Sequence, residues 1–290
     1  MEPYLSDIIN SNKIPKIIIV IFVNLLCGFI ILLGISIGTK SNSTLGIIFG
    51  IFLSISFLII AIYLIIRIMN KTSKKQKEIT LIITILFYSI IVIMNLMYAL
   101  NYIPHKKYTN KNFNIETYTS AIDMDKDGID DQTDILNNVK KYVSTKPKYK
   151  SKYYGTGYPN DEYGVCTDVV VFGLKDAGYD IKELLNKHVK ANRELYDIDI
   201  VDKNIDFRRV QNLKTYLDYN AISLTTDIYK ISEWQGGDIV VFKRHIGIVS
   251  DKRNYKGISF VIHHANPYQK YYEEDILEYR NDLVGHYRIS

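Results

Sequence analysis

The sequence predicts an α+β domain that follows three N-terminal transmembrane helices. Three features of the 290-residue chain lead to this prediction. Long apolar runs fill the first 100 residues, helix-like spacing of apolar residues dominates the middle, and short strand-like runs occupy the end. Helices that precede a block of strands are typical of α+β folds. We expect a membrane anchor at 1–100, a linker at 101–120 and a folded domain at 121–290.

The membrane anchor is predicted from the length of the apolar runs, which cover 14–38, 44–66 and 79–100. Each run has about 20 residues or more, enough for a helix to cross a hydrocarbon layer of about 30 Å. A cleaved signal peptide fits poorly, because three runs follow one another and no small-residue cleavage site ends the first.

The orientation of these helices is predicted from the charges in the short loops. The 67–78 loop holds five Lys or Arg residues, whereas the 39–43 loop holds one lysine. The positive-inside rule therefore places the 67–78 loop in the cytoplasm. We expect a multi-pass protein of the plasma membrane with a cytoplasmic N-terminus, an extracellular C-terminal domain and the lipid bilayer as a partner.

Charge and cysteine content exclude two classes of function. Residues 1–105 carry eight basic and three acidic side chains, whereas residues 106–290 carry 28 of each sign. A nucleic-acid partner is not expected, because the folded domain has no excess of basic residues. The two cysteines, Cys27 in the first apolar run and Cys166 in the domain, form neither a disulfide framework nor a cysteine-rich zinc pattern.

The elements of the domain are predicted from periodicity and end signals. Helices are expected at 133–143, from Cys166 to a stop at Gly178, at 181–195 and at 210–220. The first of these has Thr133 or Asp134 as its candidate N-cap. Strands are expected in the segments GDIVVFK, HIGIVSD, ISFVIHHAN and GHYRIS.

Cys166 has three interpretations: a buried apolar residue, a zinc ligand or a nucleophile. It precedes the apolar run VVVF, which favours burial. Zinc ranks lowest, since no closely spaced ligand pair accompanies the cysteine. A nucleophile needs a base with a residue to orient it, and the helix dipole at a helix start lowers a thiol pKa. His245 opens one strand candidate, and His263 with His264 ends the next, so histidines on adjacent strands are placed to supply that pair.

Six separated segments of the domain resemble the family known as domain of unknown function 1287. They are GVCTDVVVF with AGYDIKELL, DKNIDFRRVQNLKTYL, GDIVVF, HIGIVSD, FVIHHA and GHYR. The resemblance covers about residues 121–290, and six blocks in the same order make it specific. The family is grouped with the NlpC-like, papain-like cysteine peptidases, which cut peptidoglycan peptides in bacterial cell walls. It implies a papain-like domain with an antiparallel sheet and a cysteine-bearing helix.

The resemblance implies roles for individual residues. Cys166 would be the nucleophile, His245 the general base, and His263 the residue that orients it, with His264 as the alternative. Tyr154, upstream of the cysteine, would lie near the oxyanion. No cofactor is implied for catalysis.

The chain also departs from the NlpC-like pattern. Asp168 replaces a glycine of the common motif, and it either complements the helix dipole or contacts substrate. Arg208 and Arg209 either hold an acidic group of the substrate, or form an ion pair with Asp206 or a solvated face.

An acidic loop, DMDKDGIDDQTD at 123–134, precedes the first helix of the domain. Its carboxylates stand at the spacing of calcium-binding loops, and they are Asp123, Asp125, Asp127, Asp131 and Asp134. The alternative is a solvated turn that caps the 133–143 helix. We expect a structural Ca²⁺ site here.

Taken together, the sequence predicts a membrane-anchored, extracytoplasmic cysteine hydrolase that cleaves peptide or amide bonds of cell-wall peptidoglycan. Two alternatives remain at this point. One is a wall-binding module that keeps the fold without catalysis, and the other is a hydrolase or transferase directed at lipid acyl groups.

Overall fold

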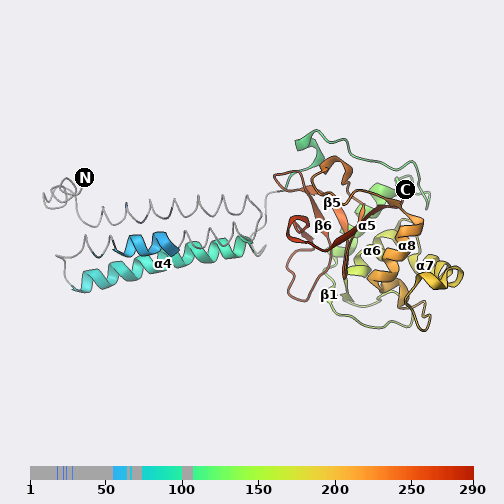
Figure 1. Cartoon of the computed structure of the whole chain (residues 1–290), viewed down its shortest axis with the longest axis horizontal. Coiled ribbons are helices and arrows are strands. Elements are labelled where there is room, and N and C mark those ends of the chain that lie inside the picture. Colours follow the sequence, from blue (N-terminus) through green and yellow to red (C-terminus); the bar gives the residue numbers. More distant parts are fainter. Residues whose placement is uncertain are drawn as a thin grey trace. The chain divides into compact units, whose positions relative to one another are not determined.

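The computed structural model describes residues 55–63, 74–99 and 107–290, together with residues 18, 22, 24, 28 and 66 (Figure 1). The chain divides into two compact units, Met1–Pro104 and His105–Ser290. In the first unit, helix α4 spans Lys74–Ala99, and the buried Tyr88 packs with Ala61 in a small apolar cluster.

The predicted membrane anchor requires correction. Within the described residues, no helix is both long and apolar enough to cross a membrane. Helix α4, which falls on the third predicted span, has four charged side chains among its first five residues. The 14–38 span and much of the 44–66 span lie outside the described residues.

The prediction of three transmembrane helices is therefore contradicted, and so is the multi-pass localisation drawn from it. An apolar run meets only one requirement of a membrane span. The same run must also form one continuous helix that carries few charges.

The second unit is α+β, and its helices agree closely with the periodicity of the sequence. Helix α8 coincides with the predicted 210–220 segment, and α6 begins at Cys166 as expected. Helix α5 begins earlier than predicted, because the Asp130 side chain accepts the Thr133 N–H and acts as the N-cap. The α-helices are α5 (Asp131–Ser144), α6 (Cys166–Asp176), α7 (Ile181–Ala191) and α8 (Val210–Asn220).

Short 3₁₀ segments punctuate the second unit: η1 (Asn110–Phe113), η2 (Arg193–Leu195), η3 (Asp206–Arg208), η4 (Ile231–Glu233) and η5 (Leu277–Tyr279). The first of them falls in the predicted linker, 101–120. From Lys107 onward this segment packs on the domain, because Tyr108 and Arg253 exchange two backbone hydrogen bonds of 2.9 Å.

A six-stranded antiparallel sheet with the order β3-β8-β4-β5-β6-β7 forms the centre of the second unit. Its strands are β3 (Ile222–Ser223), β4 (Ile239–Phe242), β5 (His245–Arg253), β6 (Ser259–Ile262), β7 (Glu273–Glu274) and β8 (Leu283–Arg288). A separate parallel pair joins β1 (Lys148–Tyr149) to β2 (Tyr163–Gly164).

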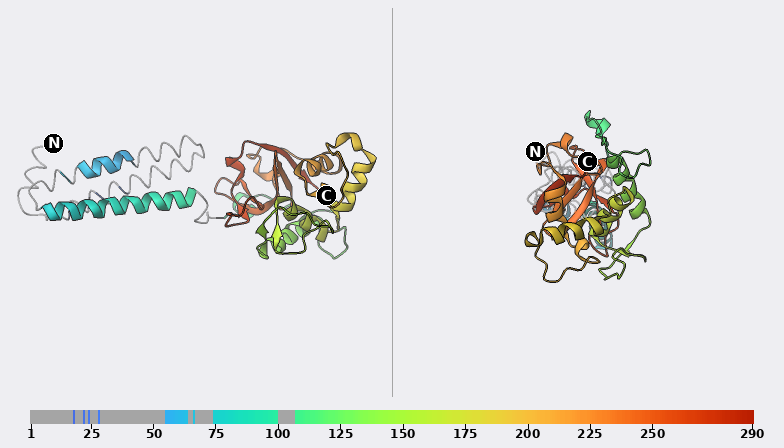
Figure 2. Two further views of the ribbon diagram at one scale, coloured as in Figure 1. Left: turned by 90° about the horizontal axis from the view of Figure 1, so that it is seen from below. Right: turned by 90° about the vertical axis from the view of Figure 1, so that its right-hand side faces the viewer.

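Both faces of the sheet are buried, which explains why β4 is apolar at every position. Ile239 and Val241 of β4 face the helices, in one cluster with residues of α5, α6, α7 and α8. Val240 and Phe242 face the opposite side, where Trp234 and Leu277 from irregular segments complete a second cluster. The helices therefore gather on one side of the strands, as two views show (Figures 1 and 2). This arrangement sets the start of α6 against the start of β5.

Candidate active site

Cys166 is the first residue of α6, and the short β1–β2 pair holds the chain that leads into it. Tyr149 lies opposite Gly164 in the β1–β2 register, two residues before the cysteine. Cys166 is a free cysteine of intermediate exposure, and its sulfur accepts a hydrogen bond from the backbone N–H of Ile246. The cysteine therefore meets β5 beside His245, the first residue of that strand.

The environment of Cys166 keeps its thiol protonated. Burial raises the pKa of Cys166 to about 11, and the backbone hydrogen bonds from Ile246 and Thr167 oppose this only in part. The sequence predicted a lowered pKa from the helix dipole, and this was wrong for the structure as it stands. Desolvation of a thiolate outweighs the dipole when the sulfur is packed between a helix start and a sheet.

His245 begins a chain of three polar side chains. Its Nε2 lies 2.9 Å from Nδ1 of His263, and the Nε2 of His263 lies 3.2 Å from a carboxylate oxygen of Glu274. The two imidazole rings are nearly perpendicular, with centroids 4.9 Å apart. His245 and His263 are both buried. Of the two histidines weighed from the sequence, His263 is the one that contacts His245.

We assign the proton positions of the two histidines from the partners of their ring nitrogens. Carboxylate oxygens of Glu274 accept, so His263 carries its proton on Nε2 and accepts at Nδ1. His245 must then carry its proton on Nε2, which donates to His263. The Nδ1 of His245 is left with a lone pair, and no residue in the described part of the chain hydrogen-bonds to it.

Gly247 permits the approach of the two histidines. A Cβ at this position would lie 2.6 Å from Val261 Cγ1, 2.9 Å from the Ile262 carbonyl oxygen and 3.1 Å from His263 Cβ. Two of these three atoms belong to backbone or to the base of a side chain, so they have little freedom to move. The glycine of HIGIV therefore keeps β5 and β6 close enough for the contact between His245 and His263.

His245 is neutral in this environment. Burial, with a smaller contribution from His263, lowers the pKa of His245 to about 3. No hydrogen bond joins its ring to the Cys166 thiol among the described contacts. The resting pair is therefore a neutral thiol beside a neutral imidazole.

His264 points to a different part of the site. Its ring makes edge contacts with Tyr149 and Tyr272, at centroid distances of 5.1 Å in each case. Its Nδ1 is buried without a partner, and burial lowers the pKa of His264 to about 4. Burial and the neighbouring Cys166 raise the pKa of Tyr149. The Tyr149 side chain thus lies between the cysteine and His264.

Tyr154, which the family resemblance placed near the oxyanion, is directed elsewhere. Its hydroxyl donates to Asp161 over 2.8 Å, and the Arg208 guanidinium lies 5.1 Å from its ring centre. Burial and the hydrogen bond to Asp161 raise the pKa of Tyr154 to about 12. Tyr149, which the sequence did not single out, is the upstream tyrosine that the structure brings to Cys166.

Asp168 and Arg208 form a buried ion pair. The Arg208 Nε and Nη2 atoms donate to the two Asp168 oxygens over 2.6 Å and 2.8 Å, and both side chains are almost fully inaccessible. Asp168 also accepts the Val165 N–H over 2.8 Å, and Arg208 donates to the Lys152 carbonyl over 2.7 Å. The pair holds the loop before Cys166 to the first turn of α6, and both side chains are engaged by protein groups. Arg209 is exposed and approaches Asp206 at 3.9 Å.

Glu274 is a second residue of the site that sequence analysis missed. It lies in β7, which pairs with β6 so that Val261 is opposite Glu274. Two consecutive glutamates in a polar segment give no signal in the sequence. Only the register of β6 and β7 brings Glu274 to His263.

The structure groups only three of the five carboxylates that the sequence predicted as calcium ligands in the acidic loop. Asp123, Asp125 and Asp127 place carboxylate oxygens within 4.8 Å of one another, a spacing that suits oxygen ligands of one cation. Asp131 instead accepts from the Met124 N–H and the Tyr179 hydroxyl. Asp134 is buried, and this burial, with the nearby charge of Asp127, raises its pKa to about 6. Calcium binding stays a prediction that concerns the first three carboxylates.

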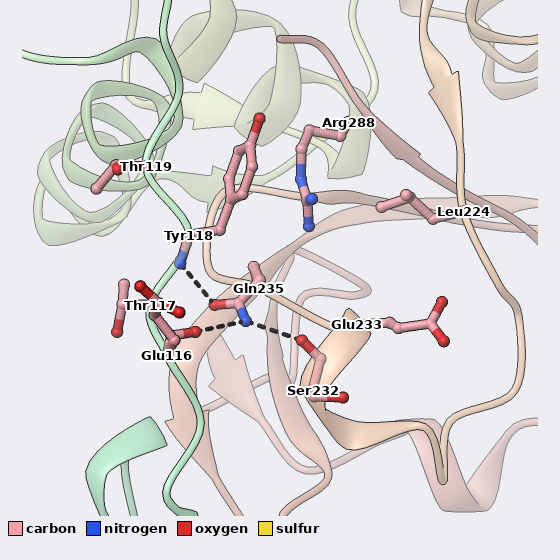
Figure 3. A pocket seen from close by; sticks show the side chains of 9 residues that line it. All are labelled: Glu116, Thr117, Tyr118, Thr119, Leu224, Ser232, Glu233, Gln235 and Arg288. Atoms are coloured by element: carbon pink, nitrogen blue, oxygen red, sulfur yellow. Dashed lines mark hydrogen bonds between the residues drawn. The ribbon is translucent and has the colours of Figure 1, made fainter.

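A cavity of about 380 Å³ lies near the end of β8, between the 116–119 segment and Arg288 (Figure 3). Gln235 accepts the Tyr118 N–H and donates to the carbonyls of Glu116 and Ser232. Arg288 is paired with Asp238 over 2.8 Å. None of the residues that line this cavity belongs to the site at Cys166.

Fold and site together define an α+β domain with a cysteine at a helix start, beside a chain of two histidines and a glutamate. The chain belongs to the family described as Domain of unknown function (DUF1287), whose sequence model matches residues 136–289. It is 34% identical over 167 residues to the uncharacterised protein YijF of Escherichia coli strain K12, an alignment that covers 53% of this chain and 80% of that protein. No solved structure matches the chain.

Proposed function

We propose that this protein is a cysteine hydrolase of the NlpC-like, papain-like class, and that it cleaves peptide or amide bonds of cell-wall peptidoglycan. The observation that carries the proposal is the chain from His245 through His263 to Glu274, which leaves Nδ1 of His245 as an acceptor. Cys166 lies at the same end of β5, with its sulfur at the Ile246 N–H. A thiol next to an oriented imidazole is the arrangement that nucleophilic catalysis requires.

The first step of the proposed reaction is acylation. Nδ1 of His245 takes the proton of the Cys166 thiol as the sulfur bonds to the carbonyl carbon. The C–N bond then breaks, and the imidazolium returns that proton to the departing amine. The product is a thioester on Cys166 together with a free amine.

The second step is hydrolysis of the thioester. His245 takes a proton from water as the water oxygen bonds to the acyl carbon. The C–S bond breaks, and the proton returns to the sulfur. The carboxylic acid leaves and the neutral pair is restored.

Two donors support the oxyanion of each tetrahedral intermediate. The backbone N–H of Cys166 stands at the start of α6, where no preceding turn of the helix uses it. The Tyr149 hydroxyl is the second donor in this proposal, because Tyr154 donates to Asp161 instead.

The test is hydrolysis of purified peptidoglycan fragments by the full-length chain, with the released products identified by mass spectrometry. Wild-type protein is expected to release cleaved peptides, and Cys166→Ala is expected to release none. His188→Gln serves as a matched control, since His188 lies on α7 and bonds to Tyr196 outside the site. Equal product from wild type and Cys166→Ala would overturn the proposal.

A second candidate function is a non-catalytic wall-binding module. The observation in its favour is the neutral resting pair, because burial raises the pKa of Cys166 and lowers that of His245. The two functions differ in thiol chemistry. Alkylation by iodoacetamide that depends on His245 and accelerates when wall fragments are added supports catalysis. Alkylation no faster than that of a free thiol, with and without fragments, supports binding alone.

A further inference from the structure

A cavity of about 690 Å³ lies between the C-terminal end of α5 and the β6–β7 edge of the sheet. We refer to it as the basic cavity, because five of the residues that line it are lysines. They are Lys107, Lys140, Lys146, Lys252 and Lys270. The apolar part of its wall includes Val143 and Ile262.

The positive charge of the basic cavity exceeds the negative charge around it. Glu273 lines the wall and is paired with Lys107. Asp251 pairs with both Lys140 and Lys252, at 2.7 Å and 3.2 Å. Five lysines and one carboxylate side chain, that of Glu273, line the wall. Residues 106–290 as a whole are balanced, so this charge is concentrated locally.

The basic cavity shares its wall with the histidine chain. Gln269 lines it and donates to the His263 carbonyl over 3.2 Å and to Glu274 over 3.4 Å. Tyr272 also lines it, and accepts the His263 N–H through its carbonyl over 2.8 Å. The Tyr272 ring contacts His264. A ligand in the cavity would thus lie next to segments that contact His263 and His264.

We propose that the basic cavity binds a carboxylate-bearing peptide segment of the substrate. The inference rests on the proposed function, and it names the substrate class: an acidic peptide, held by lysine ammonium groups while another part of it reaches Cys166. Lysines on several elements present point charges that suit carboxylates in more than one orientation. Val143 and Ile262 offer apolar surface to the aliphatic part of such a segment.

The arrangement of the lysines around the cavity favours a short acidic peptide over a nucleic acid. Nucleic acids follow an extended basic stripe that neutralises many phosphates, whereas these lysines surround one concave site. No arginine lines the cavity, so the bidentate fork that recognises phosphate oxygens is missing there. A cavity of this volume accommodates a few residues of a peptide.

The experiment measures binding to full-length protein that carries Cys166→Ala, so that no turnover occurs. The probe is a fluorescein-labelled peptide of four glutamates, and the comparison probe contains four glutamines. Fluorescence polarisation is expected to show affinity for the glutamate probe about tenfold above that for the glutamine probe. Added Lys146→Gln and Lys270→Gln changes are expected to lower the affinity about tenfold.

The control removes the same charge elsewhere. Lys187→Gln with Lys190→Gln alters two exposed lysines of α7, which does not line the basic cavity, and is expected to leave the affinity unchanged. Thermal unfolding of each variant verifies that it is folded. Equal loss in the cavity and control variants would show general charge attraction and overturn the proposal.

Two further probes test whether the basic cavity prefers phosphate groups to carboxylates. Inorganic phosphate and a single-stranded oligonucleotide are tested as competitors of the glutamate peptide. Tighter binding of either one, lost in the Lys146→Gln/Lys270→Gln variant, would overturn the assignment to carboxylates. Because the thiol is absent, the result does not depend on hydrolysis. If the Cys166→Ala protein binds the glutamate peptide but the wild-type protein is inactive on peptidoglycan, the proposed hydrolase function is contradicted and the acidic-peptide site still stands.

Discussion

Two buried polar clusters flank Cys166, and they differ in what they leave unsatisfied. On the helix side, Asp168 and Arg208 form a bidentate ion pair, and both also bind backbone groups of the loop before the cysteine. On the strand side, His245, His263 and Glu274 form a chain with a direction. The first cluster has no group left for chemistry, whereas the second ends in the lone pair of His245 Nδ1.

This difference separates a structural role from a reactive one. A buried ion pair with every oxygen engaged has no free group to offer a ligand, and here it holds a loop in place. A neutral imidazole with one open nitrogen can accept a proton, because its partner stabilises the cation that forms. Chemical type alone would not have distinguished the clusters, since both contain an acidic and a basic side chain.

The largest expected effect comes from removing His245, the residue of the strand-side cluster whose Nδ1 can accept a proton. His245→Ala is expected to lower kcat/KM on peptidoglycan fragments about 10³-fold, because the thiol then lacks its proton acceptor. The comparison is with His188→Gln, which is expected to retain wild-type kcat/KM. A loss below tenfold in His245→Ala would remove the histidine from the proposed mechanism.

The helix-side cluster is expected to affect stability instead. Asp168→Asn leaves the Arg208 guanidinium buried without its partner, and should lower the free energy of unfolding by about 3 kcal/mol in urea titration. Replacement of both partners, by Asp168→Leu with Arg208→Met, should lower the free energy of unfolding by less than Asp168→Asn alone does.

The control for this stability effect is Glu233→Gln, which breaks an exposed contact with Lys230. Exposed pairs contribute little, so this change should alter the unfolding free energy by less than about 1 kcal/mol. Equal effects of Glu233→Gln and Asp168→Asn would contradict a structural role for the buried pair.

His264 is expected to make stability depend on pH. Its folded pKa of about 4 lies below its ordinary value of 6.5, so its contribution is fully present above pH 6.5 and is lost as pH falls toward 4. His264→Phe keeps the ring contacts and removes this titration. Between about pH 7.5 and about pH 5, wild type should lose about 2 kcal/mol more unfolding free energy than the variant. Parallel stability curves would show that His264 is not buried in its neutral form.

Glu274 tests the direction of the strand-side chain. Glu274→Gln offers a donor as well as an acceptor, so the proton no longer has to lie on Nε2 of His263. We expect kcat to fall about tenfold and its pH profile to shift. Glu233→Gln is the matched control, because Glu233 pairs with Lys230 outside the site. Identical kcat values for Glu274→Gln and wild type would show that Glu274 does not orient the two histidines.

The smallest expected effect concerns calcium. At a Ca²⁺ concentration ten times Kd, a single site raises the unfolding free energy by about 1.4 kcal/mol. We expect differential scanning calorimetry to show this gain at about 10 mM Ca²⁺, and Asp125→Asn with Asp127→Asn to abolish it. Asp197→Asn with Asp199→Asn makes the same charge change elsewhere and should preserve it. An unfolding midpoint that does not respond to Ca²⁺ would exclude the site.

Sequence patterns predicted the helices and strands because these depend on local spacing of apolar residues. Helix α8 and the start of α6 lie where periodicity placed them. The membrane-spanning prediction was wrong for the described residues, since apolar composition alone does not decide whether a span forms.

The site was predictable only in part. Cys166, His245 and His263 stand at element ends, which sequence signals identify, and the structure brings His263 to His245. Tyr149 and Glu274 were missed, because each reaches the site through pairing between segments far apart in the chain.

The sequence by itself determined the order of the elements, the cysteine at a helix start and the histidines on neighbouring strands. Only the tertiary structure decided which histidine contacts the base, that Asp168 and Arg208 pair with each other, and that lysines from separate segments surround one cavity. The physical reason is the distance along the chain over which each effect acts. Periodicity and capping act over a few residues, whereas register, burial and charge balance depend on which distant segments meet.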